Sequence, residues 1–342
     1  MIYFISDTHF GHSNIINICQ RPFESIEQMD NVLIDNWNNI VTNNDIVYIV
    51  GDFAGDNADA DYYLDKLNGK KILILGNHDR NWIKKLYKRK NWDIFKDPDY
   101  KLLIKKGYFY DIKHYTEKVI NGQFFTICHY PMIDFAFSSK LFGEKFGFHI
   151  HGHIHNNLKE EFKYLFRAFN TLNCGVEINN YKPVNLEELI LNNQTYKLKY
   201  MCNSLDKAYF LSSKYHQNQF DKAGKPYFEH PKYVASLLTE ENEKIVAYLH
   251  DILEDTDIDL RILKENFTDE IIQAVLTMTH DKNDSYFDYI DKISKNKIAR
   301  KVKIADLTHN SDLKRLKNVT EKDLERVEKY NRALSILKNI QD

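Results

Sequence analysis

The first 200 residues alternate between short apolar runs and longer amphipathic stretches. The apolar runs are residues 2–5, 45–50, 72–75, 124–128 and 148–150. Their length and their content of Ile, Val and Phe predict buried strands. Over residues 26–40, apolar side chains recur at spacings of three and four, which predicts an amphipathic helix. Strands that alternate with helices predict an α/β structure for this part of the chain.

The second part of the chain shows only helical periodicity. Residues 243–253 and 322–340 each place apolar side chains on one face at the 3.6-residue period, and no strand pattern stands out. This predicts an all-α bundle. Between the two parts, residues 192–206 lose the apolar pattern, so we place the domain boundary there, with domains at 1–201 and 202–342.

Composition limits the classes of function. A chain of 342 residues exceeds one typical domain. Lys and Arg number 24 in residues 1–200 and 23 afterwards, against 24 and 25 acidic residues, so charge does not indicate nucleic-acid binding, although it does not exclude it. Four scattered cysteines, no signal-like start and no apolar run of about 18 residues favour a cytoplasmic protein that does not enter a membrane.

Candidate chemistry gathers where the predicted strands end. The side chains that follow them and carry metal-binding atoms are Asp7, His9, Asp52, Asn77, His129, His153 and His155, with His78 beside them. Each alone is more often a helix cap or a structural residue. Together, mixed nitrogen and oxygen donors suit Mn, Fe or Zn, and seven candidates exceed the needs of one ion. The pattern therefore predicts two divalent transition metals bridged by a carboxylate.

These motifs resemble those of the calcineurin-like metallophosphoesterases, over roughly residues 1–190. The resemblance implies an α/β four-layer sandwich of two mixed β-sheets flanked by helices. It also implies that one ion is held by Asp7, His9, Asp52 and His155, and that Asp52 bridges to a second ion held by Asn77, His129 and His153. His78 would protonate the leaving group or stabilise the transition state. The stretch after Asp52 lacks the Arg of phosphoprotein phosphatases, which favours a phosphodiester or nucleotide substrate.

In the second part, ionisable residues interrupt helices that are otherwise apolar. His230 precedes Pro231 at a predicted helix start, and His250-Asp251 lie within a predicted buried helix, followed by Glu254 and Asp255. Asp306 lies in another apolar helix, one turn before Asn310. Charged groups on buried helices are rare unless they are paired or bind metal.

This second set resembles the HD superfamily and, more narrowly, the hydrolase domain of RelA/SpoT-type alarmone enzymes, over about residues 205–315. The resemblance implies an HD-type helical domain with one Mn²⁺ on His230, His250, Asp251 and Asp306. Glu254 and Asp255 would activate water, while Lys222 and Asn310 would contact the substrate. The Arg-Lys pair of that family is Asp221-Lys222 here, which weakens the expectation of guanine specificity.

The sequence therefore predicts a bifunctional metal-dependent phosphohydrolase that acts on small nucleotides, with a phosphoesterase joined to a Mn-dependent nucleotide 3′-pyrophosphate or 3′-phosphate hydrolase. One alternative is a phosphoesterase regulated by a catalytically idle nucleotide sensor. Another is an RNA-processing phosphoesterase. No feature predicts an oligomeric state.

Overall fold

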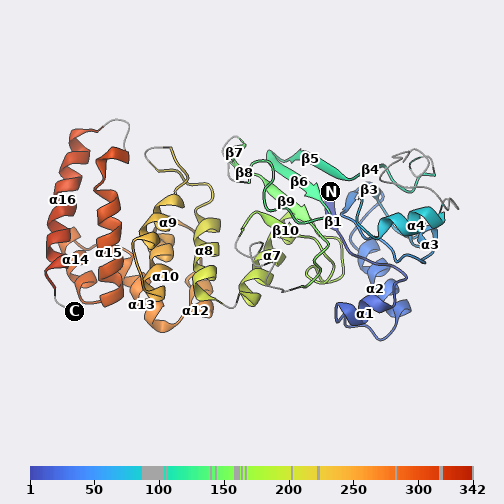
Figure 1. The fold of residues 1–342 in the computed structure, drawn as a ribbon, viewed down its shortest axis with the longest axis horizontal. Helices are drawn as coiled ribbons and strands as arrows, with labels where there is room; N and C mark the ends of the chain where they lie inside the picture. The colour runs from blue at the N-terminus through green and yellow to red at the C-terminus, as the bar shows by residue number, and fades with distance from the viewer. Residues whose placement is uncertain are drawn as a thin grey trace. The chain divides into compact units, whose positions relative to one another are not determined.

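The computed structural model describes residues 1–86, 104, 106–138, 141–142, 145–157, 162, 165, 168–201, 203–221, 224–281, 283–315 and 319–340. It divides into two compact units, Met1–Tyr200 and Met201–Asp342 (Figure 1). The division lies beside the boundary expected from the sequence, while the independence of the two parts as domains stays a prediction. Among the described helices, none combines the length and apolar character needed to cross a membrane.

The first unit contains two four-stranded sheets. The first has the order β1 (Ile2–Ile5), β2 (Ile46–Ile49), β3 (Lys70–Ile74) and β4 (Asp111–Lys113), and its ladders are parallel. The second has the order β10 (Thr171–Asn173), β9 (Phe148–His151), β6 (Gln123–Cys128) and β5 (Tyr115–Ile120). It is mixed, because β5 runs antiparallel to β6. β7 (Leu141–Phe142) and β8 (Lys145–Phe146) form a small separate hairpin.

Alternation along the strands divides the core between two faces. Val47 and Ile49 of β2 join a cluster with the helices, whereas Tyr48 packs with Phe125 and Ile150 of the second sheet. The two sheets therefore face one another through one apolar layer, and helices cover the other face of the first sheet. This agrees with an α/β phosphoesterase arrangement of two sheets and helices; the four-layer detail stays a prediction.

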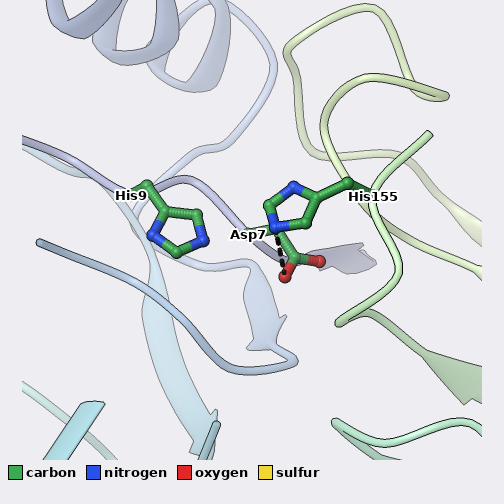
Figure 2. A group of neighbouring side chains, drawn as sticks. All are labelled: Asp7, His9 and His155. Carbon is green, nitrogen blue, oxygen red and sulfur yellow. Dashed lines mark ion pairs between the residues drawn. The ribbon is translucent and has the colours of Figure 1, made fainter. Parts of the chain in front are cut away.

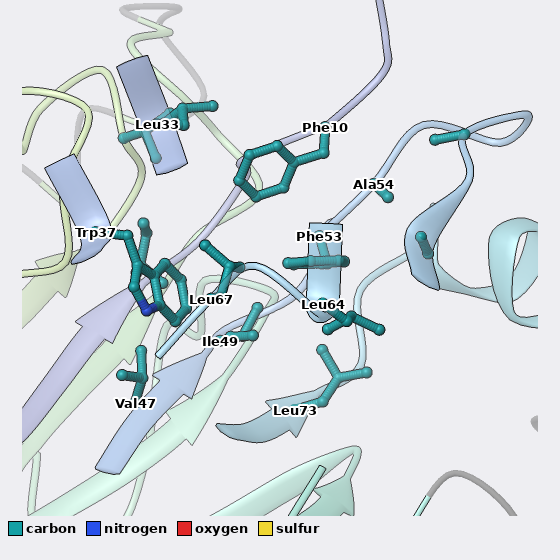
Figure 3. Close-up of a cluster of buried hydrophobic side chains, with 14 of the residues drawn as sticks. Phe10, Leu33, Trp37, Val47, Ile49, Phe53, Ala54, Leu64, Leu67 and Leu73 are labelled. Atoms are coloured by element: carbon teal, nitrogen blue, oxygen red, sulfur yellow. The ribbon is translucent and has the colours of Figure 1, made fainter. Parts of the chain in front are cut away.

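Helices fill the crossovers between the strands of the first sheet. They are α1 (Asn14–Ile18), α2 (Ile26–Asn38), α3 (Ala60–Leu64) and α4 (Asp79–Leu86). The helix expected at 26–40 is α2, whose first turn is capped by the Ser25 side chain accepting from Gln28 N. Figure 3 shows Leu33 and Trp37 of α2 packed with Val47, Ile49 and Phe10 in the core.

One local expectation from the sequence is wrong, and one segment is more regular than its pattern indicates. The weakly patterned residues after 192 belong to α7, which runs without a break over Leu186–Tyr200. His250 and Asp251 do not lie inside one continuous helix, because α10 (Glu241–Leu249) ends before them and α11 (Ile252–Asp255) begins after them. At both places the short-range pattern of apolar residues did not reveal where backbone hydrogen bonding continues or stops.

The described residues of the second unit are mainly helical, with one isolated bridge between Phe220 and Pro226. Its helices are α8 (Ser204–Tyr215), α9 (Glu229–Ser236), α10, α11, α12 (Leu260–Asn266), α13 (Asp269–Met278), α14 (Tyr286–Ser294), α15 (Lys297–Asn310) and α16 (Glu321–Lys338), with a 3₁₀ turn at Leu313–Arg315. α15 and α16 lie side by side (Figure 1). The region is helical as expected, and its assignment to the HD type stays a prediction.

Candidate metal-binding sites

The loops after the parallel strands bring the predicted side chains of the first unit together. Asp7 and His9 follow β1, and Asp52 follows β2. His153 and His155 follow β9 on the second sheet. Because parallel strands end at one edge of a sheet, residues far apart in sequence meet there.

One cluster consists of Asp7, His9 and His155, whose candidate donor atoms all lie within 4.8 Å of one another. His155 Nε2 lies 3.8 Å from Asp7 Oδ1, with the His9 ring beside the pair (Figure 2). The His9 and His155 rings are stacked at 5.2 Å. Three donors therefore surround one small space.

A second cluster consists of Asp52, His129 and His153, again within 4.8 Å. Asn77 belongs to it, because its Oδ1 lies 3.1 Å from His129 Nε2 and 3.0 Å from His153 Nδ1. Asp52 connects the two clusters: its Oδ2 lies 3.7 Å from His9 Nε2 and 3.4 Å from His129 Nε2. The structure therefore brings all seven predicted metal ligands of the first unit into two adjoining groups with one carboxylate between them.

The donor set fits divalent transition ions. His9 is 1% exposed, and neither ring nitrogen has a hydrogen-bond partner among the described residues. Burial, helped by the nearby charges of His155 and Arg21, holds the pKa of His9 well below its usual value, so the ring is a neutral donor. A buried imidazole with two unsatisfied nitrogens is costly unless something else binds it. Coordination of an ion would satisfy that requirement.

The backbone at these donors is unusual. Asp7, His9, Asp52, His153 and His155 all have positive φ, between 49° and 71°. Left-handed conformation costs a non-glycine residue about 1–2 kcal/mol. Such strain persists only where surrounding contacts enforce it, and it gathers at functional sites. These five angles turn the side chains inward at the strand ends.

Two glycines allow the loops to approach closely. A Cβ at Gly76 would lie 2.3 Å from Asp52 Oδ1, and one at Gly152 would lie 2.4 Å from Asp7 Oδ2. Real Cβ atoms do not approach other atoms that closely. The space beside the carboxylates therefore depends on glycine at both positions.

Buried partners that the sequence did not reveal hold the first cluster in place. Glu177 Oε1 accepts from His155 Nδ1 at 2.9 Å and from Arg21 Nη2 at 2.7 Å, and the Arg21 and Glu177 side chains are 0% and 2% exposed. Although burial opposes ionisation, His155 and Arg21 lower the pKa of Glu177 to about 2. Arg21 also donates to the carbonyls of Asp7 and Thr8. Arg21 carries no motif signal, so only the fold reveals this role.

Asp79, the last residue of the Gly-Asn-His-Asp stretch, also supports the site. Its carboxylate accepts from the backbone N–H groups of Asp52, Phe53 and Gly76 and from Trp82 Nε1, at 2.7–3.0 Å. One buried side chain thereby joins the loops that follow β2 and β3. Asp79 is a positioning residue, which explains why an Asp ends the motif without joining either donor cluster.

His78 lies beside Asp52 and His9 and is partly exposed. Its backbone N–H donates to Asp52 Oδ1 at 2.8 Å, and its ring Nδ1 lies 3.4 Å from Asp56 Oδ1. The side chain is 38% exposed and its ring lies 5.2 Å from that of His9. The His12 ring lies 6.2 Å from the His78 ring, while His149 and His151 are buried.

In the second unit, His230, His250 and Asp306 form a buried group with donor atoms within 4.8 Å of one another. His230 Nε2 lies 3.2 Å from Asp306 Oδ1. Asp251 adjoins them, with its Oδ2 3.0 Å from His250 Nε2 and 3.7 Å from His230 Nε2. The four predicted ligands therefore meet, although they come from α9, α15 and the break between α10 and α11.

Two more residues, Tyr227 and Lys303, pair with these carboxylates. The Tyr227 hydroxyl donates to Asp251 Oδ2 at 2.5 Å and to Asp255 Oδ2 at 3.2 Å. Burial, together with the Asp251 charge, raises the pKa of Asp255. Lys303 Nζ lies 3.0 Å from Asp306 Oδ2. Asp255 therefore lies next to the cluster through Tyr227, with a pKa moved toward the range of a general acid or base.

The other predicted residues lie further from the cluster or are engaged elsewhere. Glu254 Oε2 accepts from the backbone N–H of His280 at 3.1 Å. Asn310 Nδ2 donates to Asp306 Oδ1 at 2.6 Å, so it orients a candidate ligand in this structure. Lys222 lies outside the described residues.

Comparison with known proteins agrees with this geometry. Residues 1–157 match the model of the calcineurin-like phosphoesterase family. An uncharacterized protein of Methanocaldococcus jannaschii is 34% identical over 192 residues, covering 55% of this chain and 89% of the relative. The N-terminal part of the chain belongs to the calcineurin-like phosphoesterase family. The chain is therefore a phosphoric ester hydrolase.

The C-terminal part has relatives of another kind. A guanosine-3′,5′-bis(diphosphate) 3′-pyrophosphohydrolase of Borreliella burgdorferi is 31% identical over 93 residues, which cover 25% of this chain but 14% of the relative. The chain thus spans a small share of such relatives. Among solved structures, a protein of unknown function from Aquifex aeolicus is 30% identical to this chain, with a TM-score of 0.39. The match covers 55% of this chain and 96% of that chain.

Proposed function

We propose that this chain is a bifunctional metal-dependent phosphohydrolase acting on small nucleotides. The first unit would hydrolyse a phosphodiester or nucleotide phosphate at two divalent ions of Mn, Fe or Zn. The second would release a 3′-pyrophosphate or 3′-phosphate from a nucleotide at a single Mn²⁺. Groups of imidazoles and carboxylates in both units, two adjoining clusters in the first and one in the second, support two activities.

The observation that carries the first activity is the position of Asp52 between the two clusters. A carboxylate with one oxygen near a histidine of each cluster is suited to bridging two ions. When bound, the ions would neutralise charge that develops on the phosphoryl oxygens. The half-exposed His78 would give a proton to the leaving oxygen, and Asp56 would orient its ring.

The test of the first activity is Asp52→Asn, measured by metal content and by hydrolysis of bis-p-nitrophenyl phosphate. An amide keeps the shape but loses the charge, so we expect both ions and most of the activity to be lost. The control is Asp35→Asn on the exposed face of α2, which should change neither. Wild-type metal content and rate in Asp52→Asn would rule out the two-ion proposal.

For the second activity, Asp255 is the residue that we assign to water activation. Its carboxylate lies next to Asp251 through Tyr227. We expect Asp255→Ala to bind Mn²⁺ normally and to lose release of the 3′ group from nucleotides such as ppGpp, pppApp and NADPH. Asp291→Ala is the control, because Asp291 pairs with Lys295 on the exposed face of α14. No 3′ release by the wild type with Mn²⁺ would defeat the hydrolase proposal.

A nucleotide sensor is the second candidate for the helical unit. It is favoured by the engagement of Glu254 with the His280 backbone, which occupies one of the two proposed water-activating acids. A sensor would bind nucleotide without turnover and would alter the diesterase rate of the first unit. Measuring that rate with and without added nucleotide separates the two candidates.

A further inference from the structure

A cavity of about 440 Å³ opens beside the candidate metal cluster of the helical unit. Its wall includes His230 and Tyr233 of α9 and His309 near the end of α15. Its size is that of pockets which hold small-molecule ligands. Because His230 belongs to both the cluster and the wall, a molecule in the cavity lies next to the cluster.

Three rings adjoin one another along this wall. Tyr233 stacks on His309 with ring centroids 4.2 Å apart and an interplanar angle of 27°. His309 lies edge to edge with His230, because the two rings are nearly coplanar, at 9°, and their Nδ1 atoms are 2.7 Å apart. Tyr233 itself is 48% exposed. Its exposed aromatic surface is therefore already oriented by the His309 ring, which is held in turn by a buried candidate ligand.

An oriented, half-exposed aromatic ring is suited to stacking with a planar ligand. Nucleobases stack on Tyr at little entropic cost when the ring is held in advance. Tyr233 occupies the wall that also carries Asp221.

Cationic groups lie on the same wall. Lys225 and Lys232 both contribute to it. Lys232 Nζ lies 3.2 Å from Glu229 Oε1, and both side chains are about half exposed, so the pair is weak and exchangeable. Lys225 is fixed near the cavity by a tight turn in which its backbone N–H donates to Asp221 Oδ1 at 2.9 Å. Asp221, Glu229 and Asp312 line the same cavity, so a phosphate would take the ammonium groups over from these carboxylates. A flat aromatic surface with such exchangeable ammonium groups nearby matches a nucleoside phosphate.

We propose that Tyr233 is the base-stacking residue of the helical unit and that the cavity binds the nucleoside of a phosphorylated purine nucleotide. The base lies on Tyr233, the lysines contact phosphate oxygens on its 5′ side, and the 3′ side of the ribose faces His230. The orientation of the nucleotide, with its 3′ side toward His230, rests on the proposed function. His309 is a positioning residue, since its Nδ1 lies 2.7 Å from His230 Nδ1.

The test compares wild type, Tyr233→Phe and Tyr233→Leu in the full chain loaded with Mn²⁺. The probes are GDP and ADP, which have no 3′ phosphate to be released, and inorganic pyrophosphate, which has no base. Titration calorimetry measures their affinities, and metal analysis measures Mn²⁺ content. Leu keeps an apolar side chain of similar reach but removes the aromatic face, whereas Phe keeps the face and removes the hydroxyl.

We expect Tyr233→Leu to weaken both nucleoside diphosphates at least about tenfold, in line with the measured contribution of base stacking. Tyr233→Phe should bind them as the wild type does. Pyrophosphate affinity and Mn²⁺ content should be equal in all three proteins. For turnover of a 3′-phosphorylated nucleotide, Tyr233→Leu should raise KM and leave kcat nearly unchanged.

Several results would overturn the proposal. These are equal nucleotide affinity in wild type and Tyr233→Leu, an equal loss of pyrophosphate affinity, or no nucleotide binding by the wild type. Loss of Mn²⁺ in Tyr233→Leu would instead assign Tyr233 and His309 to holding His230 in place. If nucleotides bound in a Tyr233-dependent way but the wild type released no 3′ group, the hydrolase function would be wrong and this binding site would stand. Failure of the site and failure of the hydrolase function are therefore distinguishable.

Discussion

At the scale of single residues, both candidate sites use imidazoles close to carboxylates, and each set has buried partners of opposite charge. Arg21 pairs with Glu177, which holds His155. In the helical unit, Lys303 pairs with Asp306. Burying an unpaired charge is costly, so each pair keeps its site both charged and folded. The donors were readable from sequence because they follow strands or interrupt apolar helices. Their partners were not: Arg21 lies in no motif, and Lys303, although it lies three residues before Asp306, carried no signal of its pairing role.

Glu177→Gln tests the role of the buried pair. The substitution preserves the shape of the side chain but leaves the Arg21 guanidinium without its counter-charge, so we expect the free energy of unfolding to fall by about 3–5 kcal/mol. Denaturant unfolding measures it. The control is Glu188→Gln, since Glu188 forms a partly exposed pair with Lys182, and a change of about 0–1 kcal/mol is expected there. Equal effects at both positions would contradict the assigned role.

Lys197 allows a prediction about pH. Its ammonium is buried and donates to the carbonyls of Ala168 and Thr171 at 2.7 and 2.6 Å, and burial lowers its pKa to about 7 from 10.5. Between these two pH values the unfolded chain holds more protons than the folded one. The free energy of unfolding of the wild type should therefore rise with pH in this window, relative to Lys197→Met.

Unfolding of both proteins at pH 6, 8 and 10 measures that difference. Lys199→Met is the control, because Lys199 is exposed on the same helix, α7. A difference between wild type and Lys197→Met that stays constant with pH would show that the acceptor carbonyls keep Lys197 charged despite its burial.

At the scale of structural elements, the strands could be predicted from the apolar runs, and the candidate ligands from the polar residues that follow each run. This succeeds because the burial of a strand leaves a strong local pattern in the sequence. The backbone conformation of the connecting loops could not be predicted in this way. Positive φ at Asp7, His9 and Asp52 depends on contacts between loops, such as the bonds that Asp79 accepts. Likewise the interruption between α10 and α11 places His250 and Asp251 at a turn. Such features arise from tertiary contacts, which a local sequence pattern does not contain.

Gly76→Ala tests how closely the loops after β2 and β3 must approach. Its Cβ would meet Asp52 Oδ1 at 2.3 Å and Asp52 N at 2.7 Å, so the bridging carboxylate must move. We expect loss of metal and a fall in diesterase rate of at least about tenfold, which corresponds to a barrier change of about 1.4 kcal/mol.

Gly122→Ala is the matched control for Gly76→Ala. Gly122 lies in the hairpin between β5 and β6 with φ of 75°, and a Cβ there would meet nothing within 4 Å. It should cost about 1 kcal/mol of stability through backbone strain and leave metal content unchanged. If Gly76→Ala retained its metal and its rate, Asp52 would not be confined as the structure indicates.

At the scale of the whole molecule, the chain combines two units that each have a core and a candidate site. The sequence indicated this division through a change of period, from strands and helices to helices alone. It did not show that α7 continues to Tyr200, beside the join. The helix propensity of residues 192–200 is obscured by Asn and Thr, and the Asn193 side chain accepts from Asn173 N in β10. A polar residue that serves a tertiary contact weakens the apolar pattern by which a helix is recognised in sequence.

The structure makes the separation of the two activities testable by a cut after Tyr200. Neither fragment loses part of a helix at this cut. α7 remains whole, and α8 keeps its N-cap, in which Asn203 Oδ1 accepts from Leu205 N at 2.7 Å. We expect residues 1–200 to retain two ions and diesterase activity, and residues 201–342 to be helical, to unfold cooperatively and to retain 3′ release with Mn²⁺. Circular dichroism, metal analysis and the two assays measure this. If neither fragment were active alone but mixing restored both activities, the sites would require both units, and the proposal of two independent hydrolases would fail.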